Sequence, residues 1–105
     1  MARLKVFWTE TAISQRNQIF VYWNKRNKST RFSRKLNAKI KERIALLVLN
    51  PEMSTETDFK GIRTSVLIYY SILYKFDNQN LYIMGVWDNR QNPEKLLNFL
   101  KRIKS

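Results

Sequence analysis

The chain of 105 residues has room for one core, and its content of 44% hydrophobic and 13% aromatic residues excludes a disordered protein. It has no cysteine and no histidine, which excludes disulfides, thiolate or imidazole metal sites and a histidine general base. Twenty basic against eight acidic residues give a net charge of +12, which attracts polyanions such as nucleic acids and acidic protein segments. We therefore expect a single domain over residues 1–105 that uses no metal or other cofactor.

The positive charge lies mainly in the first half of the chain. Residues 1–50 hold 12 basic and 2 acidic residues, whereas residues 51–105 hold 8 and 6. No apolar run approaches the roughly 18–20 residues that span a bilayer, and the start of the chain lacks the pattern of a signal peptide. These features predict a cytoplasmic protein with no membrane partner.

The first half of the sequence predicts one strand and two helices. Residues 4–8 have the apolar pattern of a short strand. A helix is expected over about 10–27, with a threonine cap and Glu10 in its first turn, where the helix dipole favours negative charge. After cap signals at 27–30, a second helix is indicated by a stripe of apolar residues at steps of four, four, four and three: Phe32, Leu36, Ile40, Ile44 and Leu47. The second helix ends before Pro51, and the short connection predicts an antiparallel helical hairpin.

The second half predicts a sheet and a final helix. Residues 51–60 are expected to form a polar loop and residues 62–66 a short strand. Residues 68–88 have the texture of a β-hairpin whose turn lies at 77–80. The last helix opens with Asn92 as cap and Pro93 at the first helical position. The predicted class is α+β, with the order β-α-α-β-β-β-α and the helical hairpin packed on a small, mostly antiparallel sheet.

Three stretches, in this element order, give the chain its resemblance to the RelE/ParE superfamily of toxins. They are residues 59–63 (Phe-Lys-Gly-Ile-Arg), residues 70–76 (Tyr-Ser-Ile-Leu-Tyr-Lys-Phe) and residues 87–96, where the last strand passes through a basic turn into the final helix. The resemblance implies a growth-inhibiting toxin of a bacterial type II toxin–antitoxin module, neutralised by a cognate antitoxin. RelE-like members cleave messenger RNA in the ribosomal A site, whereas ParE-like members bind DNA gyrase without catalysis.

Three residues are candidates for catalysis if the chain is a metal-independent endoribonuclease. Arg90 lies where the last strand turns into the last helix and is the candidate phosphate or transition-state clamp; pairing with Asp88 is its structural alternative. Arg63 lies early in the sheet, and its alternative is pairing with the acidic 52–58 loop. Lys95 is the candidate proton donor.

The chain departs from the pattern of the active nucleases at two positions. RelE-like nucleases carry an arginine directly after the first tyrosine of the central-strand motif, and this chain has Ser71 there. They also place a tyrosine a few residues beyond the basic turn, where this chain reads Pro-Glu-Lys-Leu at 93–96. These absences favour gyrase inhibition, but the charge suits an RNA-rich target. On balance we favour ribosome-dependent messenger cleavage, with gyrase inhibition as the alternative.

A run of basic residues on the second helix predicts contact with a polyanion. Lys35, Lys39 and Arg43 repeat at four-residue steps and so share one helix face, and residues 25–43 hold nine basic residues against Glu42 alone. Such a stripe suits phosphate contacts without sequence preference; its alternative is a solvated surface. The predicted nucleic-acid-binding residues are Lys28, Arg31, Lys35, Lys39, Arg43 and Lys60. A non-toxic nucleic-acid-binding module is the third functional hypothesis.

Overall fold

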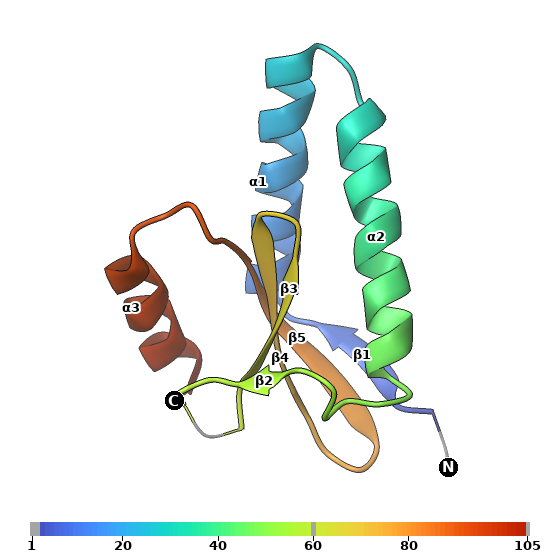
Figure 1. The fold of residues 1–105 in the computed structure, drawn as a ribbon, viewed down its shortest axis with the longest axis vertical. Coiled ribbons are helices and arrows are strands. Elements are labelled where there is room, and N and C mark those ends of the chain that lie inside the picture. Colours follow the sequence, from blue (N-terminus) through green and yellow to red (C-terminus); the bar gives the residue numbers. More distant parts are fainter. Residues whose placement is uncertain (1–2, 60, 105) are drawn as a thin grey trace.

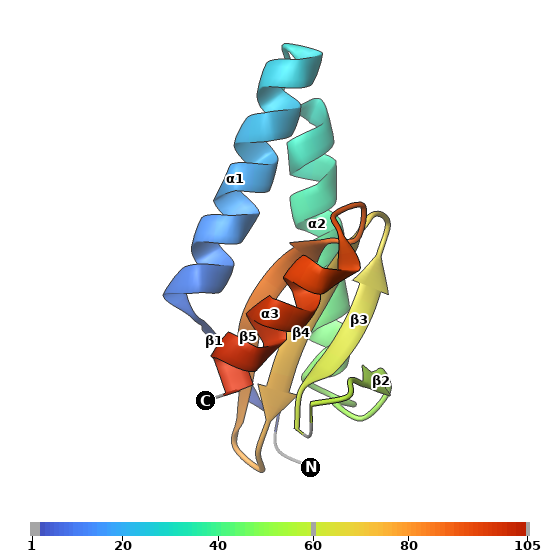
Figure 2. The same cartoon turned by 90° about the vertical axis from the view of Figure 1, so that its left-hand side faces the viewer.

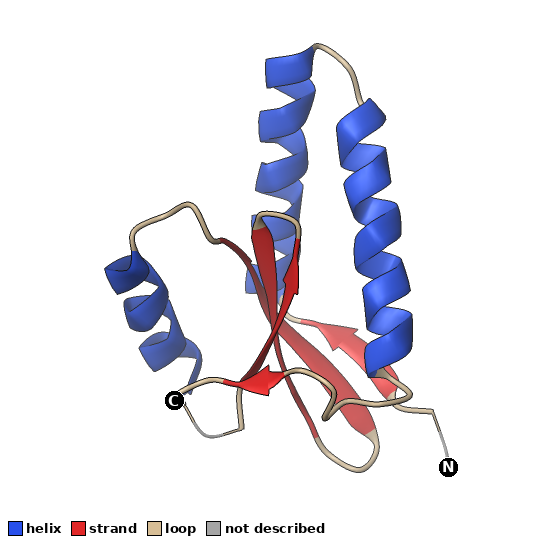
Figure 3. Cartoon of the chain, in the orientation of Figure 1, coloured by secondary structure: helices blue, strands red, loops and turns tan. Residues whose placement is uncertain are grey.

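The computed structural model describes residues 3–59 and 61–104, which form a five-stranded sheet between a helical hairpin and a single helix (Figures 1 and 3). The helices are α1 (Glu10–Asn27), α2 (Arg31–Leu47) and α3 (Pro93–Lys104). The strands are β1 (Lys5–Trp8), β2 (Thr55–Glu56), β3 (Arg63–Leu67), β4 (Tyr70–Phe76) and β5 (Asn80–Asp88). The α+β class and the helical hairpin predicted from the sequence are therefore confirmed.

The strand order in the sheet is β1-β5-β4-β3-β2. β1 runs parallel to β5, and all other neighbours are antiparallel. Between β4 and β5, Leu73 pairs with Gly85 but Tyr74 pairs with Ile83, so β5 carries one extra residue, Met84, at a bulge. The two longest strands thus lie in the middle of the sheet and the shortest at one edge.

The sheet is covered on both faces, and each face has its own core (Figure 2). On the hairpin side, Leu36, Ile40, Ile44 and Leu47 of α2 pack against strand residues that include Ile72, Tyr74, Leu81 and Ile83. On the α3 side, Phe99 and Leu100 pack with Ile62, Leu73 and Trp87. In the part of the chain that the structure describes, no helix combines the length and apolar character needed to cross a membrane.

Two of the predicted helix starts are confirmed by their caps. The Thr9 hydroxyl accepts a hydrogen bond from the backbone N–H of Ala12 at 3.1 Å, and the Asn92 side chain accepts one from the N–H of Glu94 at 2.9 Å. Each bond satisfies a backbone donor that the helix itself cannot pair. The start of α2 differs, because Thr30 makes no side-chain capping bond there.

The structure departs from the sequence-based prediction at both ends of β3. Residues 51–60 were expected to be loop throughout, but Thr55 and Glu56 pair with β3 as the short edge strand β2. Ile68 was expected to lie in a strand because it is β-branched, yet Leu67 pairs with Tyr70, and Ile68 therefore lies in a two-residue turn with a φ of 59°. Such turns require a positive φ, so tertiary pairing overrides local preference at this position.

Gly85 of β5 lies close to side chains of both helical layers, Phe99 of α3 and Gln15 of α1. A Cβ atom there would lie 2.7 Å from the Phe99 ring and 3.0 Å from the Gln15 side chain. We expect Gly85→Ala to lower the free energy of unfolding by about 1–3 kcal/mol, the usual range for overpacking, as measured by urea denaturation. Phe99→Leu in the same chain should relieve part of this cost, so strictly additive effects of the two substitutions would contradict the proposed clash.

Candidate functional site

An open groove of about 660 Å³ lies where α1 passes β5 and the turn that follows it. It is lined by side chains of α1, of the central strands and of this turn, namely Gln15, Gln18, Ile19, Tyr22, Tyr70, Val86, Trp87, Asp88, Arg90 and Gln91. Gln15 joins α1 to β5 along one wall of this groove, because its side-chain oxygen accepts a hydrogen bond from the backbone N–H of Val86 at 2.9 Å. The groove thus joins the helical hairpin to the basic turn that was singled out in the sequence.

Arg90 is held in this site by Asp88. Its Nε and Nη2 atoms donate to the two carboxylate oxygens of Asp88 at 3.0 and 2.9 Å, and its backbone N–H donates to the same carboxylate at 2.9 Å. This two-point geometry gives charge-assisted bonds in a fixed orientation. The hydrogen bond from Arg90 lowers the pKa of Asp88, and the bond to Asp88 raises the pKa of Arg90. The pairing offered as the alternative reading of Arg90 is therefore present.

Three aromatic rings lie beside the same guanidinium, whose side chain is 43% exposed. Its central carbon lies 5.4 Å from the ring centre of Trp23, 5.0 Å from that of Tyr69 and 5.9 Å from that of Tyr70. Cations over aromatic faces gain about 0.5–1 kcal/mol at exposed sites. The Trp23 indole N–H donates to the Tyr70 hydroxyl at 2.6 Å, which ties α1 to β4. Burial raises the pKa of Tyr70, and its hydrogen bond with Trp23 opposes this only in part.

Ser71 anchors the turn that carries Arg90. Its side chain is buried, and its hydroxyl donates to the side-chain oxygen of Asn89 at 2.9 Å. The Asn89 backbone N–H in turn donates to the carbonyl of Tyr69 at 2.8 Å. Where nucleases of the superfamily carry an arginine, this chain therefore has a residue that holds the turn. Asn89 was not singled out in the sequence, where only its place between Asp88 and Arg90 pointed to it.

The structure does not bring the three predicted catalytic residues together. Arg63 donates to the backbone carbonyls of Ser54 at 2.6 Å and Glu52 at 3.4 Å, so it pairs with the 52–58 loop through carbonyls and not through carboxylates. It lies opposite Tyr74, four residues or about 13 Å along β4 from Tyr70, which contacts Arg90. Lys95 is exposed in the first turn of α3. The groove beside Arg90 is lined by neither Arg63 nor Lys95.

Four of the predicted nucleic-acid-binding residues are exposed along the outer part of the hairpin: Lys28, Arg31, Lys35 and Lys39. Arg43 is engaged with the sheet, since it donates to the Ser65 hydroxyl and the Val66 carbonyl, both at 2.8 Å. Lys60 lies outside the described residues. No group of three or more Asp, Glu, His or Cys residues in the described chain is placed to hold a metal ion.

Comparison with known proteins places this fold in a known class. Residues 6–93 match the family model for the ParE toxin of the type II toxin–antitoxin system parDE. A solved structure, the chromosomal ParDE toxin–antitoxin system from P. aeruginosa, has a chain with the same fold at a TM-score of 0.70 and 18% identity, covering 82% of this chain and 96% of that one. No curated protein matches the sequence.

The fold and the family match define a toxin of a type II toxin–antitoxin system. Because the family model spans most of the sequence, the chain belongs to the ParE toxin family. The superfamily resemblance read from the sequence is thereby confirmed, and membership implies an antitoxin partner.

The Asp88–Arg90 pair predicts a pH dependence of stability. Because the pKa of Asp88 is lowered from its ordinary value of 3.8, the pair stabilises the fold above that value, and this contribution is lost as the pH falls through the lowered pKa. Asp88→Asn should lower the free energy of unfolding by about 0.5–1 kcal/mol at neutral pH, since the pair is partly exposed. Urea denaturation at several pH values should show this difference narrowing in acid.

The asparagine keeps an acceptor for the backbone N–H of Arg90, so the comparison isolates the charge. In an Arg90→Gln background the same substitution should have a smaller effect, because the partner is already absent. A difference between wild type and Asp88→Asn that stays constant from neutral to acidic pH would count against this account.

Proposed function

We propose that this chain is a non-catalytic toxin that acts in the cytoplasm by inhibiting DNA gyrase and is neutralised by its antitoxin. The observation that carries the proposal is the state of Arg90, whose charge is matched by Asp88 and whose side chain is held by three aromatic rings. A guanidinium fixed in this way presents a defined surface for a partner. In the proposed mechanism Arg90 positions the turn at the edge of the groove and takes part in no reaction.

Messenger cleavage makes different demands on the site. The 2′-hydroxyl must lose a proton, the phosphorane must be stabilised and the leaving oxygen must be protonated, which requires several groups around one phosphate. Arg90 is paired with a carboxylate, Arg63 is bound to the loop before β3, and Ser71 holds Asn89. This arrangement and the match to the ParE family support gyrase inhibition over the nuclease activity that the sequence favoured.

Ribosome-dependent cleavage remains the second candidate because of one observation. The exposed lysines and arginines of the helical hairpin suit an RNA-rich partner as well as a DNA-bound enzyme. In that case Lys95 would be the proton donor and Arg90 would have to exchange Asp88 for a phosphate.

Two assays on the purified protein separate the candidates. We expect inhibition of supercoiling when the toxin is added to gyrase and relaxed plasmid, and intact A-site messenger in a reconstituted translation reaction. Lys95→Ala should leave gyrase inhibition unchanged within about twofold, whereas loss of a general acid costs a nuclease about 100-fold or more.

The reverse pattern, with unaffected supercoiling and messenger cut in a Lys95-dependent way, would overturn the proposal in favour of the nuclease. If both assays are negative and cells expressing the chain without an antitoxin grow normally, the non-toxic nucleic-acid-binding module is the better description. In these assays Arg90→Lys tests the contact between Arg90 and Asp88, because lysine keeps the positive charge but cannot make the two-point contact.

A further inference from the structure

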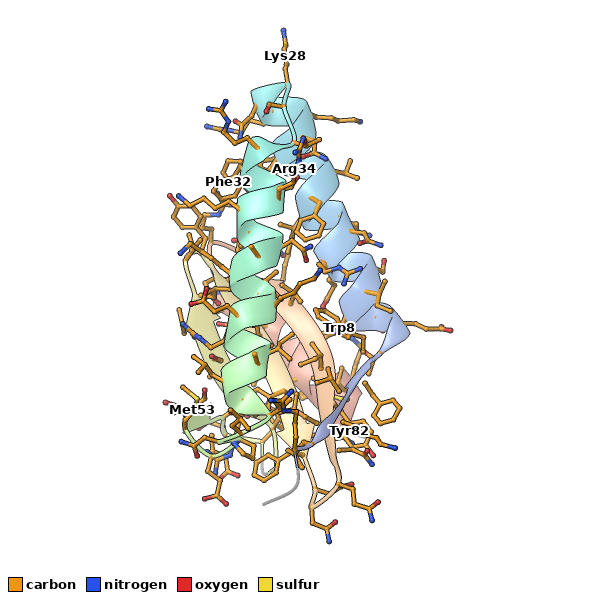
Figure 4. All side chains as sticks on the ribbon, turned by 90° about the vertical axis from the view of Figure 1, so that its right-hand side faces the viewer. Trp8, Lys28, Phe32, Arg34, Met53 and Tyr82 are labelled. Carbon is orange, nitrogen blue, oxygen red and sulfur yellow. The ribbon has the colours of Figure 1, made fainter. Side chains whose placement is uncertain are left out.

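The end of the helical hairpin gathers six basic residues, which we call the cationic tip: Lys25, Arg26, Lys28, Arg31, Arg34 and Lys35. No acidic residue occurs between Glu10 and Glu42, so none on either helix of the hairpin balances these charges nearby. Lys28 sits at the left-handed position that ends α1, and its side chain projects from the end of the molecule (Figure 4). The tip is therefore a concentrated positive charge that faces solvent.

Four of the eight acidic residues lie at the end of the molecule opposite to the cationic tip, beside basic residues that include Lys5, Arg63 and Lys75. The hairpin extends beyond the end of the sheet, whereas β2 and the turn between β4 and β5 lie at the opposite end (Figure 1). Glu52, Glu56 and Asp58 lie in or beside β2, and Asp77 lies in that turn. Because exposed charges are screened beyond about 8–10 Å, these acids do not neutralise the cationic tip.

Two residues of the cationic tip are explained by helix stability, and two others oppose it. Lys25 and Arg26 lie in the last turn of α1, where positive charge is favourable. By contrast, α2 has no acidic residue in its first turn and begins at Arg31. Arg34 donates to the Thr30 hydroxyl at 2.9 and 2.7 Å, and that hydroxyl does not cap the helix. Positive charge is thus kept where the helix dipole disfavours it, which points to an external anion.

The composition of the cationic tip indicates which anion it suits. The side chains of Lys25, Lys28, Arg31 and Lys35 make no hydrogen bond or ion pair with any described residue, so they are available to a ligand. Phe32, the aromatic residue within 25–35, is partly buried against the core, and its ring centre lies 4.5 Å from that of Trp23, so it offers little free ring face on which an unpaired base would stack. Two adjacent helices are about 20 Å across, wider than the roughly 12 Å major groove of DNA. This surface suits the phosphates along a duplex and not the edges of its bases.

We propose that the cationic tip binds the phosphate backbone of duplex DNA without sequence preference. The choice of DNA over RNA rests on the proposed function, since gyrase acts on a DNA duplex that would lie within reach of a toxin bound to the enzyme. The groove beside Arg90 adjoins the tip, because Tyr22 lines the groove and its hydroxyl accepts a hydrogen bond from Arg26 at 3.4 Å. Lys28, Arg31 and Lys35 do not line the groove, so substitutions at these three residues test the tip alone.

Fluorescence anisotropy of a labelled duplex, measured with the full chain at several salt concentrations, tests this inference. The test variant carries Lys28→Gln, Arg31→Gln and Lys35→Gln, and the matched control carries Lys5→Gln, Lys75→Gln and Lys101→Gln, which are also exposed. Both variants lose three charges. The test variant should bind on the order of tenfold or more weakly at about 0.1 M salt, and its log–log salt slope should fall by about 2–3. The control should change by less than threefold, and thermal melts should show that both variants fold.

Equal weakening in both variants would overturn the inference, because net charge alone would then explain the binding. Tighter binding to single-stranded DNA or to duplex RNA than to duplex DNA would also overturn it. The DNA-binding test and the gyrase assay can fail independently of each other. Tip-dependent DNA binding with normal supercoiling would remove the proposed function and leave the DNA contact, whereas gyrase inhibition with no tip-dependent binding would do the opposite.

Discussion

The burial of β4 on both of its faces is the constraint on which the rest of the structure depends. Five consecutive residues, Tyr70 to Tyr74, are buried. Ile72 and Tyr74 pack toward the helical hairpin, while Leu73 packs toward α3. A strand of this kind is stable only where both faces of its sheet are covered. The chain must therefore place two helices on one face and then cross the end of the sheet to place a third helix on the other.

That crossing creates the candidate site. The turn after β5 runs from the edge of the hairpin layer to the start of α3, and several contacts hold it. Ser71 bonds to Asn89, Asp88 bonds to Arg90, and one face of the Arg90 guanidinium lies beside the rings of Trp23 in α1 and Tyr70 in β4. A turn fixed in this way keeps one shape, which favours recognition of a partner. It disfavours a reaction in which Arg90 would have to leave its carboxylate.

The same layering separates binding surface from core on the hairpin. α2 needs only one face for packing, formed by Leu36, Ile40, Ile44 and Leu47. Its other faces are free to carry charge. Near the turn of the hairpin the two helices are joined by the contact of Phe32 with Trp23 and by the hydrogen bond from the Ser33 hydroxyl to Asn24. The charged side chains of the cationic tip lie outside these contacts, at the end of the molecule opposite to the acidic loop around β2. Stability of the fold and attraction for a polyanion are thus located in different places.

The sequence by itself determined the three helices, four of the five strands and the family. The caps of α1 and α3, the apolar stripe of α2 and the turn before β5 depend on residues within about four positions of one another, so the sequence predicted them well. The family was likewise readable from the 87–96 segment. Only the tertiary structure decided the positive φ of Ile68, the edge strand β2 and the partners of the arginines. Arg43 bonds to Ser65, Arg63 to the carbonyls of the 52–54 loop, and Arg90 to Asp88 amid three rings. Most of these contacts depend on which distant segments the fold brings side by side. Before the chain folds, a long, flexible arginine side chain can reach many alternative partners.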